Sequence, residues 1–388
     1  MIELCSKKEC TGCGACHDIC PKHAITMRQD KEGFFFPEID PSLCVECTLC
    51  QKACHVLFPV KKHKRVEYPL AAVAKSDLLR QKSSSGGMFS LLALEIIAKG
   101  GVVFGAVFGD DYEVYHTKAT NEQELAALRG SKYIQSRTEN TYQEVKMYLK
   151  KGINVLYTGT PCQIAGLYGF LGKIDTTLLY TVDLVCHGVP SIKAFHLYLK
   201  KLAIKENCNV HAIKNFSFRD LKGWDITPSY RMEGKEDVNK QPVLENLYMR
   251  MFLSSFLHRE CCYHCRYTTE ERVADITIAD FWGVEKEKAF AYDITKGCSL
   301  VLLNSEKGDS LFQAVSQNLY YEERTWSEAL AQNHQLYTSS IRPKGRNNVY
   351  AYMENHTYDK IYNHYFNTPY LRFRHLVGSI LRYLHLRK

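Results

Sequence analysis

The 388-residue sequence contains no apolar run as long as the roughly 18 residues that a membrane-spanning helix needs. Its first residues, MIELCSKKEC, lack the apolar stretch of a signal peptide, and we therefore expect a cytoplasmic location. Excess charge is also small, because 50 basic and 42 acidic residues leave a net charge of +8 over the whole length, so nucleic acid is not an expected partner. With 45% hydrophobic and 24% charged residues, the composition excludes a disordered, collagenous or coiled-coil chain.

What the sequence does contain is cysteine. Sixteen cysteines in a chain without an export signal are difficult to interpret as disulfides, because the cytosol keeps thiols reduced. Nine of the sixteen lie in the first 54 residues, which marks a first domain boundary. The length itself predicts two or three domains, since it exceeds the size at which a single core stops growing. We expect the N-terminal domain to bind metal or a metal cofactor.

Two cysteine runs share the spacing C-x2-C-x2-C-x3-C. The first consists of Cys10, Cys13, Cys16 and Cys20, and the second of Cys44, Cys47, Cys50 and Cys54. Pro21 follows the first run and His55 follows the second. Two-residue gaps let one tight loop present three thiolates to a four-iron cluster, while the fourth comes from elsewhere. Zinc is the alternative, but a tetrahedral zinc site built from C-x2-C pairs has no use for the third evenly spaced cysteine. The spacing therefore predicts two 4Fe-4S clusters.

The rest of the chain predicts a second body. Residues 1–60 form the expected dicluster domain, and the basic residues 61–69 an interdomain linker. Over 70–346, short apolar runs alternate with helix-length amphipathic segments, as in an α/β fold. Strands are expected in LAAVAK, VVFGAVF, INVLYTG, TLLYTVDLVC, ADITIAD and SLVLLN, and helices in GMFSLLALEIIAK, PCQIAGLYGFL, SIKAFHLYLKKLA and PVLENLYMRMFLSSFLH. Ligands of such a sheet bind at the carboxyl ends of its strands.

Three loops of this body favour ligand binding. SSSGG at 83–87 opens a helix with free backbone N–H groups, which suits phosphate but also an ordinary helix start. RGSKY at 129–133 places two cations at a glycine turn, which suits the same phosphates or a solvated turn. TGTPC at 158–162 is a strand-to-helix turn with Pro161 at the first helical position, so Cys162 is expected beside a helix N-terminus that stabilises a thiolate.

These loops belong to a series of motifs that resembles the family of beta subunits of coenzyme F420 hydrogenase/dehydrogenase. The motifs are SSSGG at 83–87, RGSKYIQS at 129–136, TGTPCQIAGL at 158–167, DLVCHGVPS at 183–191 and ADITIADFWG at 274–283. The resemblance implies a flavoprotein that binds FAD and moves electrons through iron–sulfur clusters. It implies an α+β ferredoxin-like dicluster module followed by an α/β flavin-binding body with a mixed sheet.

The resemblance also assigns residues. By motif match, the FAD contacts would be Ser85, Gly86, Gly87, Arg129, Ser131, Lys132 and Tyr133. In the two-cluster ferredoxin arrangement the last cysteine of each run ligates the other cluster, so Cys54 would join the first run and Cys20 the second. A third cluster is expected on Cys162, Cys186, Cys262 and Cys265, with Cys262 preferred to Cys261 for its C-x2-C spacing; buried or reactive thiols are the alternative.

Two residues are candidates for catalysis. His187 follows a predicted strand and would protonate a flavin or a substrate, although a satisfied core histidine is the alternative. Asp280 ends another predicted strand and would orient a flavin ring or a substrate hydroxyl, although a capping residue at a strand end is the alternative. The sequence leaves both alternatives open.

The sequence thus predicts an oxidoreductase that takes electrons from ferredoxin or another low-potential redox protein. They would pass through the clusters to FAD and on to deazaflavin F420 or another small organic acceptor. A non-catalytic electron-relay subunit and an iron–sulfur redox sensor without flavin are the alternatives. Residues 347–388 form an expected basic helical tail, whose last twenty residues carry five basic and no acidic side chains. That tail would bind a membrane surface or a partner, or pack on the body.

Overall fold

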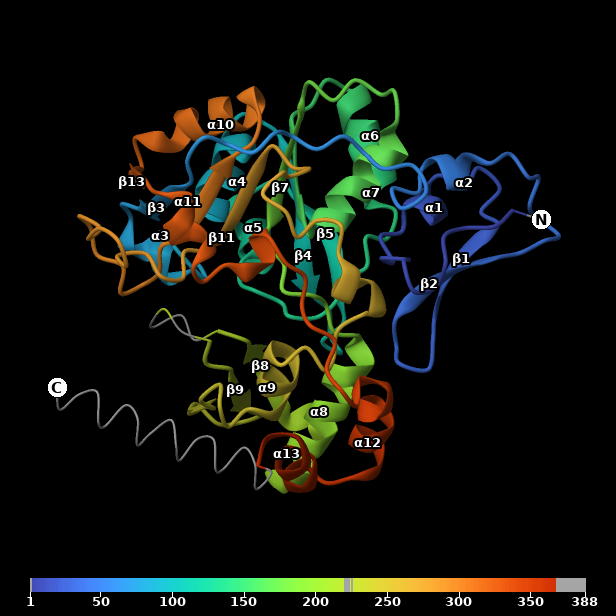
Figure 1. Ribbon diagram of the computed structural model, residues 1–388, viewed down its shortest axis with the longest axis vertical. Helices are drawn as coiled ribbons and strands as arrows, with labels where there is room; N and C mark the ends of the chain where they lie inside the picture. Colours follow the sequence, from blue (N-terminus) through green and yellow to red (C-terminus); the bar gives the residue numbers. More distant parts are fainter. Residues whose placement is uncertain (1, 220–223, 225, 368–388) are drawn as a thin grey trace.

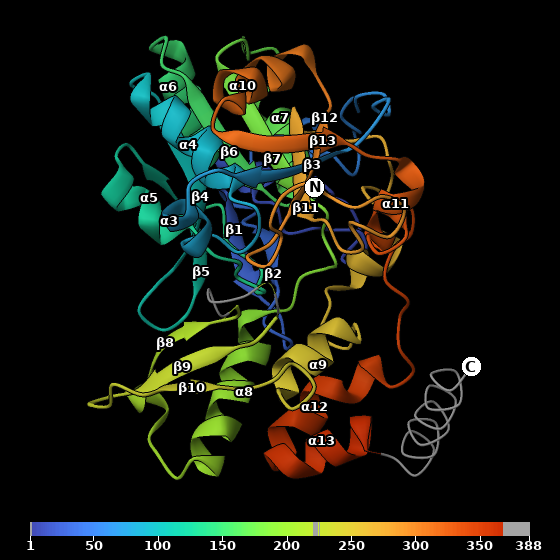
Figure 2. The same ribbon diagram turned by 90° about the vertical axis from the view of Figure 1, so that its left-hand side faces the viewer.

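The computed structural model describes residues 2–219, 224 and 226–367. They form a cysteine-rich module, a large sheet covered by helices, and a lobe built from later segments (Figure 1). Figure 2 shows the lobe at one end of the large sheet, with β8, β9 and β10 beside α8. The lobe therefore lies at one end of the large sheet, and the module lies beside α7 (Pro161–Leu171).

The module consists of two short helices and one antiparallel hairpin. Its elements are α1 (Ala15–Asp18), β1 (Ile25–Gln29), β2 (Phe35–Ile39) and α2 (Leu49–Lys52). Each helix lies within one cysteine run and follows a residue with positive φ, Gly14 at 79° and Thr48 at 63°. The left-handed conformation turns the chain sharply, so cysteines before and after the turn can face one point. The repeated cysteine spacing thus coincides with a repeated backbone conformation.

The body has a mixed sheet, as the sequence predicts. Among the described residues, eight strands are ordered β13-β3-β12-β11-β7-β6-β4-β5. Neighbours among β4, β6, β7 and β11 pair in parallel, whereas the remaining strands pair antiparallel. The strands are β3 (Leu70–Ala74), β4 (Val102–Phe108), β5 (Val114–Ala119), β6 (Val155–Gly159), β7 (Leu179–Leu184), β11 (Ile276–Asp280), β12 (Ser299–Leu303) and β13 (Leu319–Glu323). The α/β body with a mixed sheet is therefore confirmed.

Helices cover both faces of this sheet because side chains alternate along its strands. Val103 and Leu156 pack with α4 and α10, whereas Phe104 and Tyr157 pack with α6 and α7 on the opposite face. The helices of the body are α3 (Asp77–Gln81), α4 (Met88–Ala98), α5 (Glu122–Leu128), α6 (Thr141–Lys150), α7 (Pro161–Leu171), α10 (Glu306–Ser316) and α11 (Trp326–Leu330).

The lobe has its own aromatic core. Its elements are α8 (Ile192–Lys205), β8 (Ile213–Ser217), β9 (Ser229–Met232), β10 (Val238–Lys240), α9 (Leu247–Leu253), α12 (Val349–Asn355) and α13 (Tyr358–Phe366). Phe195, Phe218 and Tyr248 are fully buried in this core. Phe34 of the module hairpin is part of the same core and meets Tyr350 edge-on at a centroid distance of 6.2 Å. The module and the lobe therefore share a packed interior.

One predicted helix of the lobe is longer than the observed one. The helix expected over 242–258 extends only over α9, because Asn246 caps its start and Ser255, with φ of 62°, ends the helical path. In the first half of the tail expected from residue 347, α12 and α13 bury Met353 and Ile361 in the lobe core beside α8. The predicted basic helix over 369–388 lies outside the described residues.

The predicted linker lies along the body. The backbone N–H of His63 donates to the carbonyl oxygen of Arg272 at 2.7 Å. The guanidinium of Arg65 lies 4.6 Å from the Trp326 ring centroid, and the Trp326 indole donates to the carbonyl oxygen of Val66. These contacts fix the segment between the module and β3. None of the described helices combines the length and the apolar character that crossing a bilayer requires.

Candidate functional site

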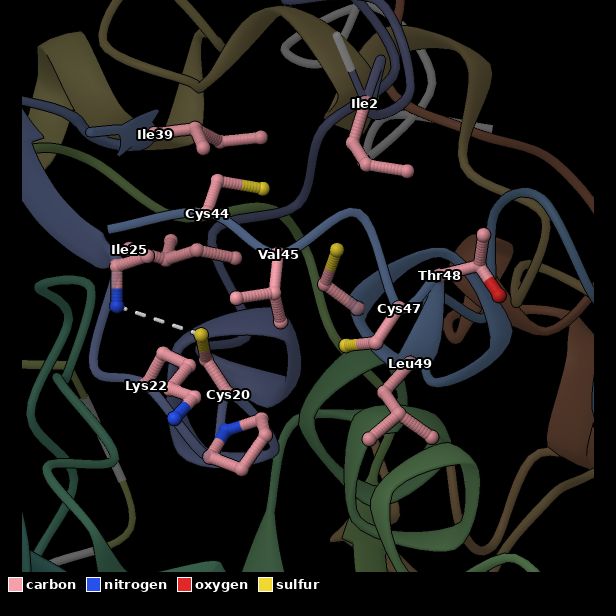
Figure 3. A pocket seen from close by; sticks show the side chains of 13 residues that line it. Ile2, Cys20, Lys22, Ile25, Ile39, Cys44, Val45, Cys47, Thr48 and Leu49 are labelled. Carbon is pink, nitrogen blue, oxygen red and sulfur yellow. Dashed lines mark hydrogen bonds between the residues drawn. The ribbon is translucent and has the colours of Figure 1, made fainter. Parts of the chain in front are cut away.

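A cavity in the module collects cysteines from both runs. Cys44, Cys47 and Cys50 line it together with Cys20, the last cysteine of the first run. Figure 3 shows Cys20 and Cys44 around the same space, with a hydrogen bond to the Cys20 sulfur. The donor of that bond is the backbone N–H of Ala24, at 3.3 Å. The structure thus groups these four thiols in the combination that the resemblance implies.

The remaining cysteines of the two runs form a second group. Cys13 interacts electrostatically with Cys10 and Cys54, and so does Cys16. Burial raises the pKa of the Cys13 thiol to about 12 and that of Cys16 well above its ordinary value. Cys5, which lies outside both runs, hydrogen-bonds to Cys10 and Cys54 and lowers the pKa of both thiols. We call these two groups the outer site (Cys20, Cys44, Cys47, Cys50) and the inner site (Cys10, Cys13, Cys16, Cys54).

The donor chemistry of both sites fits iron–sulfur clusters. Among the described residues, no three His, Cys, Asp or Glu side chains are placed to hold one metal ion. A 4Fe-4S cluster instead needs four thiolates spread around a larger body, and each site offers four thiols. Thiols release their protons when a metal cation binds them. The outer and inner sites therefore suit two clusters.

A third group of thiols lies in the body. Cys162, at the start of α7, interacts with Cys186, Cys261 and Cys265, whereas Cys262 acts on its neighbour Cys261. The segment carrying the adjacent pair is a 3-10 helix, η2 (Glu260–His264), in which neighbouring side chains point about 120° apart. Of the adjacent pair, Cys261 is the member that acts on Cys162, while the predicted Cys262 hydrogen-bonds to Cys261.

The environment of Cys162 differs from the sequence-based expectation. Its sulfur lies 3.2 Å from the hydroxyl of Thr160, at the start of α7. Removal from water nevertheless raises the pKa of the Cys162 thiol well above its ordinary value, and the neighbouring thiols raise it further. Burial also raises the pKa of Cys186 to about 12. The pKa of Cys162 is thus shifted in the direction opposite to the one expected from the helix N-terminus.

A cavity of about 580 Å³ lies at the carboxyl ends of β6, β7 and β11. Phe252 and Leu253 of the lobe line it from the opposite side. Most of the site residues predicted in the body also line it: Ser85, Gly87, Arg129, Ser131, Lys132, Tyr133, Cys162, Cys186, His187 and Asp280. The position agrees with the rule that α/β sheets bind ligands beyond the carboxyl ends of their strands.

One end of this cavity is suited to an anion. The backbone N–H of Ser131 donates to the hydroxyl of Ser84 at 3.0 Å, which joins the two predicted loops. The Arg129 side chain is 7% exposed, and its ion pair with Glu122 is long, at 3.8 Å. Among the described residues, no side chain caps the N-terminus of α4, which starts after Gly87. The first backbone N–H groups of α4 can therefore donate hydrogen bonds to a bound anion.

Two predicted FAD contacts also have structural roles in the body. The Lys132 ammonium donates to the carbonyl oxygens of Ala127, Leu128 and Arg129 at 2.8–3.2 Å, and so caps the end of α5. Burial lowers the pKa of Lys132 to about 7. Gly86 is absent from the described cavity lining, and a Cβ there would lie 2.3 Å from the carbonyl oxygen of Ala72. The close approach to β3 accounts for this glycine without a ligand.

The two catalytic candidates lie in the cavity wall. His187 Nε2 lies 3.2 Å from the carbonyl oxygen of Leu253, and its Nδ1 lies 3.0 Å from the Gln335 amide nitrogen. This pattern corresponds to a neutral imidazole protonated at Nε2. Burial lowers the pKa of His187, which favours the same neutral form. His187 is therefore placed at the ligand space with both ring nitrogens already hydrogen-bonded.

Asp280 holds an aromatic pair. Its carboxylate accepts a hydrogen bond from Arg219 at 2.5 Å and one from the Trp224 indole at 2.7 Å. Trp224 stacks on Trp282 with ring centroids 4.9 Å apart and planes inclined by 9°. Trp282 lines the cavity. The sequence singled out Asp280, and Trp282 lies in the same ADITIADFWG motif, whereas Arg219 and Trp224 lie in a segment without a recognisable motif.

Buried arginines clamp the module onto the body, and the sequence analysis missed them. Arg259 donates to the carbonyl oxygen of Cys10 at 2.7 Å and to that of Phe35 at 2.9 Å. Its guanidinium also lies 4.0 Å from the Phe36 ring centroid. Position 259 directly precedes η2, so one short segment supports both the inner site and the body thiols. The one sequence signal for this role was its proximity to the CYHC motif.

Comparison with known proteins agrees with this architecture. Residues 152–329 match the family described as the C terminus of the coenzyme F420 hydrogenase/dehydrogenase beta subunit, and residues 9–57 match the 4Fe-4S dicluster domain. Residues 152–329 thus resemble the C-terminal part of these beta subunits, and residues 9–57 carry a 4Fe-4S dicluster domain. The family resemblance inferred from the motifs is confirmed, and the dicluster domain supports iron–sulfur clusters in the chain.

Individual relatives of this chain are distant. One F420H2 dehydrogenase subunit of Methanosarcina mazei is 21% identical over 336 residues, which cover 82% of this chain and 86% of the relative. An uncharacterized ferredoxin of Methanocaldococcus jannaschii is 31% identical over 65 residues, which cover 16% of this chain and 83% of the relative. A chain from the xenon-derivatised F420-reducing NiFe hydrogenase complex of Methanosarcina barkeri aligns with a TM-score of 0.47 and 18% identity, over 71% of this chain and 91% of that chain.

Proposed function

We propose that the protein is an iron–sulfur flavoprotein oxidoreductase. Electrons from ferredoxin or another low-potential redox protein would pass through two module clusters to FAD in the large cavity. They would then reach an organic acceptor, deazaflavin F420 or another small molecule. The observation that carries the proposal is the cavity itself, which joins an anion-binding end to a thiol-lined end beside a dicluster module. Its volume of about 580 Å³ lies within the range of about 300–1,000 Å³ common for ligand sites.

The proposed FAD site uses the anion-binding end. Arg129 and the open N-terminus of α4 would hold the diphosphate, while Ser84 and Ser131 keep the two loops together. Tyr133 and Trp282 supply aromatic surface in the cavity wall. Lys132 supports this arrangement by fixing the end of α5 rather than by direct contact. FAD, when bound, would exchange electrons singly with iron–sulfur centres and in pairs with an organic acceptor.

The thiol-lined end of the cavity would supply electrons to the proposed FAD site. We propose a third cluster on Cys162, Cys186, Cys261 and Cys265, because these thiols interact with one another. Thiols that remain free and serve packing are the alternative at this position. Arg272 supports the group, since it forms a fully buried ion pair with Asp183 at 3.2 Å and donates to the carbonyl oxygens of Tyr267 and Leu184. These contacts fix the segment after η2 against the end of β7.

The two catalytic candidates have different proposed roles. His187 would donate a hydrogen bond from Nε2 to a flavin or substrate atom by exchanging its bond to the Leu253 carbonyl for one to the ligand, and it would protonate that atom only after taking up a proton itself. Gln335 would keep the ring oriented through Nδ1 during that exchange. Asp280 is a positioning residue, since its carboxylate holds Trp224 against Trp282.

The decisive experiment is the cofactor content of anaerobically purified protein, followed by reduction with ferredoxin in the presence of F420. We expect iron, sulfide and about one FAD per chain. Turnover with a small acceptor supports the oxidoreductase. FAD and clusters without turnover favour the electron-relay role, for which the naming of relatives as parts of larger enzymes is the supporting observation. Clusters without FAD favour the redox sensor and contradict the proposal.

A further inference from the structure

α7 contacts the module at two glycines, of which Gly166 lies in the TGTPCQIAGL motif and Gly169 follows it. A Cβ on Gly166 would lie 2.8 Å from the sulfur of Cys13, and a Cβ on Gly169 would lie 2.4 Å from the carbonyl oxygen of Ala53. Both glycines have ordinary helical φ values, so the backbone conformation does not require glycine at either position. The close approach of the module does.

This contact brings two thiol groups to one helix. Cys162 and Gly166 are four residues apart in α7 and therefore lie on the same side of the helix. Cys13 of the inner site touches α7 at Gly166, while Cys162 of the body group lies one turn earlier. Figure 1 shows α1 and α2 of the module next to α7. The inner site is thus the module site that borders the body.

Tyr267 fills the space beside the glycine contact. It interacts electrostatically with Cys162, Cys13 and Cys265, and so lies among thiols of both groups. Its hydroxyl lies 2.6 Å from Nδ1 of His55, whose Nε2 lies 3.0 Å from the hydroxyl of Thr11. A continuous hydrogen-bonded path therefore runs from the first cysteine loop to the body.

His55 is the residue that breaks the symmetry of the two runs. It follows the last cysteine of the second run at the position where Pro21 follows the first. Its side chain is 1% exposed and lies between Thr11 and Tyr267. Proline lacks a side chain that can bond to both residues. The departure from the repeat therefore coincides with the contact between module and body.

We infer that Gly166, Gly169, His55 and Tyr267 form the junction through which electrons leave the module, from the inner site to the body thiols. The outer site, whose Cys47 is exposed, receives electrons from the donor protein. The inference rests on the proposed function and adds the order of the sites and the residues of the junction. Each transfer moves one electron from a reduced site to an oxidised one, with a reduced ferredoxin as the source, and no covalent bond forms or breaks.

Gly166→Ala in the cofactor-loaded full-length protein tests the junction. Its added methyl group presses on Cys13, so the inner site must move away from α7. We expect ferredoxin-driven flavin reduction, followed by stopped-flow absorbance, to slow by about tenfold, within the range that a misplacement of about 1 Å produces. Iron and FAD contents stay at the wild-type level. Amide hydrogen exchange rises around Cys13 but not around Cys47, which is a readout independent of electron transfer.

Two further variants complete the test. Tyr168→Phe is the matched control on α7, because it loses one hydrogen bond to Thr181 away from the module, and its rate should equal that of the wild type. Tyr267→Phe keeps the ring but loses the bond to His55, and its rate should fall in the same direction as that of Gly166→Ala. If Gly166→Ala loses iron, the rate of flavin reduction in Tyr267→Phe decides instead.

The outcomes separate the two proposals. Wild-type protein without FAD, or unreduced by ferredoxin, contradicts the proposed function. Wild-type protein that is reduced normally while both junction variants keep wild-type rates overturns the junction alone. Should both variants lose their clusters, Cys13→Ser decides, because loss of the inner site must abolish flavin reduction. Unchanged flavin reduction in Cys13→Ser overturns the inference.

Discussion

Arg346 and Glu32 form an ion pair that spans 314 residues of sequence, with guanidinium nitrogens 3.0 and 2.7 Å from the two carboxylate oxygens. Glu32 lies at the tip of the module hairpin, between β1 and β2. Arg346 is 2% exposed and also donates to the carbonyl oxygen of His258. The pair therefore joins the module to the lobe and to the segment that leads into η2.

Removal of Glu32 should destabilise the protein, because it leaves the Arg346 guanidinium buried without its carboxylate. We expect Glu32→Ala to lower the free energy of unfolding by about 3 kcal/mol. Glu38→Ala in the same hairpin is the control, since its pair with Arg28 leaves side chains 65% and 68% exposed and should contribute less than about 1 kcal/mol. Urea unfolding followed by circular dichroism measures both. Equal effects of the two variants would show that the hairpin tip does not clamp the lobe.

Whether the last cysteine of each run ligates the cluster of the other run can be tested with two single serine substitutions. Wild-type protein should contain at least about eight iron atoms per chain. Cys20→Ser should remove the outer cluster, because Cys20 shares a cavity with Cys44, Cys47 and Cys50. Cys54→Ser should remove the inner one instead. Iron analysis and low-temperature EPR distinguish the two losses, and zinc in place of iron would refute both assignments.

FAD retention should depend on Arg129 but much less on Lys132. Arg129→Gln removes the buried cation at the anion-binding end, and we expect the dissociation constant for FAD to rise about tenfold, a cost of roughly 1.4 kcal/mol. Lys132→Gln alters the cap of α5 and should change FAD affinity only slightly. Acid release and fluorescence titration measure both. Gly86→Val should reduce folding yield rather than affinity alone, because its side chain would press on the backbone of β3.

The adjacent cysteines of η2 should behave differently. If a third cluster is present, iron rises to about twelve atoms per chain. Cys261→Ser should then lose about four of them, whereas Cys262→Ser should keep them, because Cys261 is the member that interacts with Cys162. Iron analysis of the full-length variants decides. The opposite result would restore the ligand choice predicted from the C-x2-C spacing, and about eight iron atoms in wild type would leave these thiols without a cluster.

We expect the folded protein to lose stability in mild acid because of the buried His116. Burial lowers its pKa from 6.5 to about 4 in the folded protein. As the pH falls below 6.5 the unfolded chain binds the proton first, so stability decreases between pH 6.5 and pH 4 by up to about 3 kcal/mol and is unaffected above that range. His116→Phe keeps the stacking on Tyr157 and removes the titration. Unfolding midpoints at about pH 7 and about pH 5 should differ less in the variant than in the wild type.

Local patterns carried the successful predictions. The C-x2-C spacing acts within a single loop, and the period of apolar residues acts within a single strand or helix, so both can be read without knowing the fold. Arg259 lies 249 residues from its partner Cys10, and no local pattern indicates such a pairing. The choice between Cys261 and Cys262 depends on the rotational phase of one short helix. Gly86 looked like a phosphate-site glycine because close approach to a strand and close approach to a ligand require the same residue.

The shared core of module and lobe also constrains biosynthesis. Phe34 is synthesised long before α8 and more than three hundred residues before Tyr350, yet it packs with both. Both cysteine loops are complete well before those partners appear, so cluster insertion can precede the closure of the body around them. The hairpin then acquires its final contacts only when the last helices have emerged from the ribosome, and such distant contacts form slowly. A chain that ends before residue 346 would contain all of its cysteines, but the hairpin tip would lack the ion pair between Glu32 and Arg346.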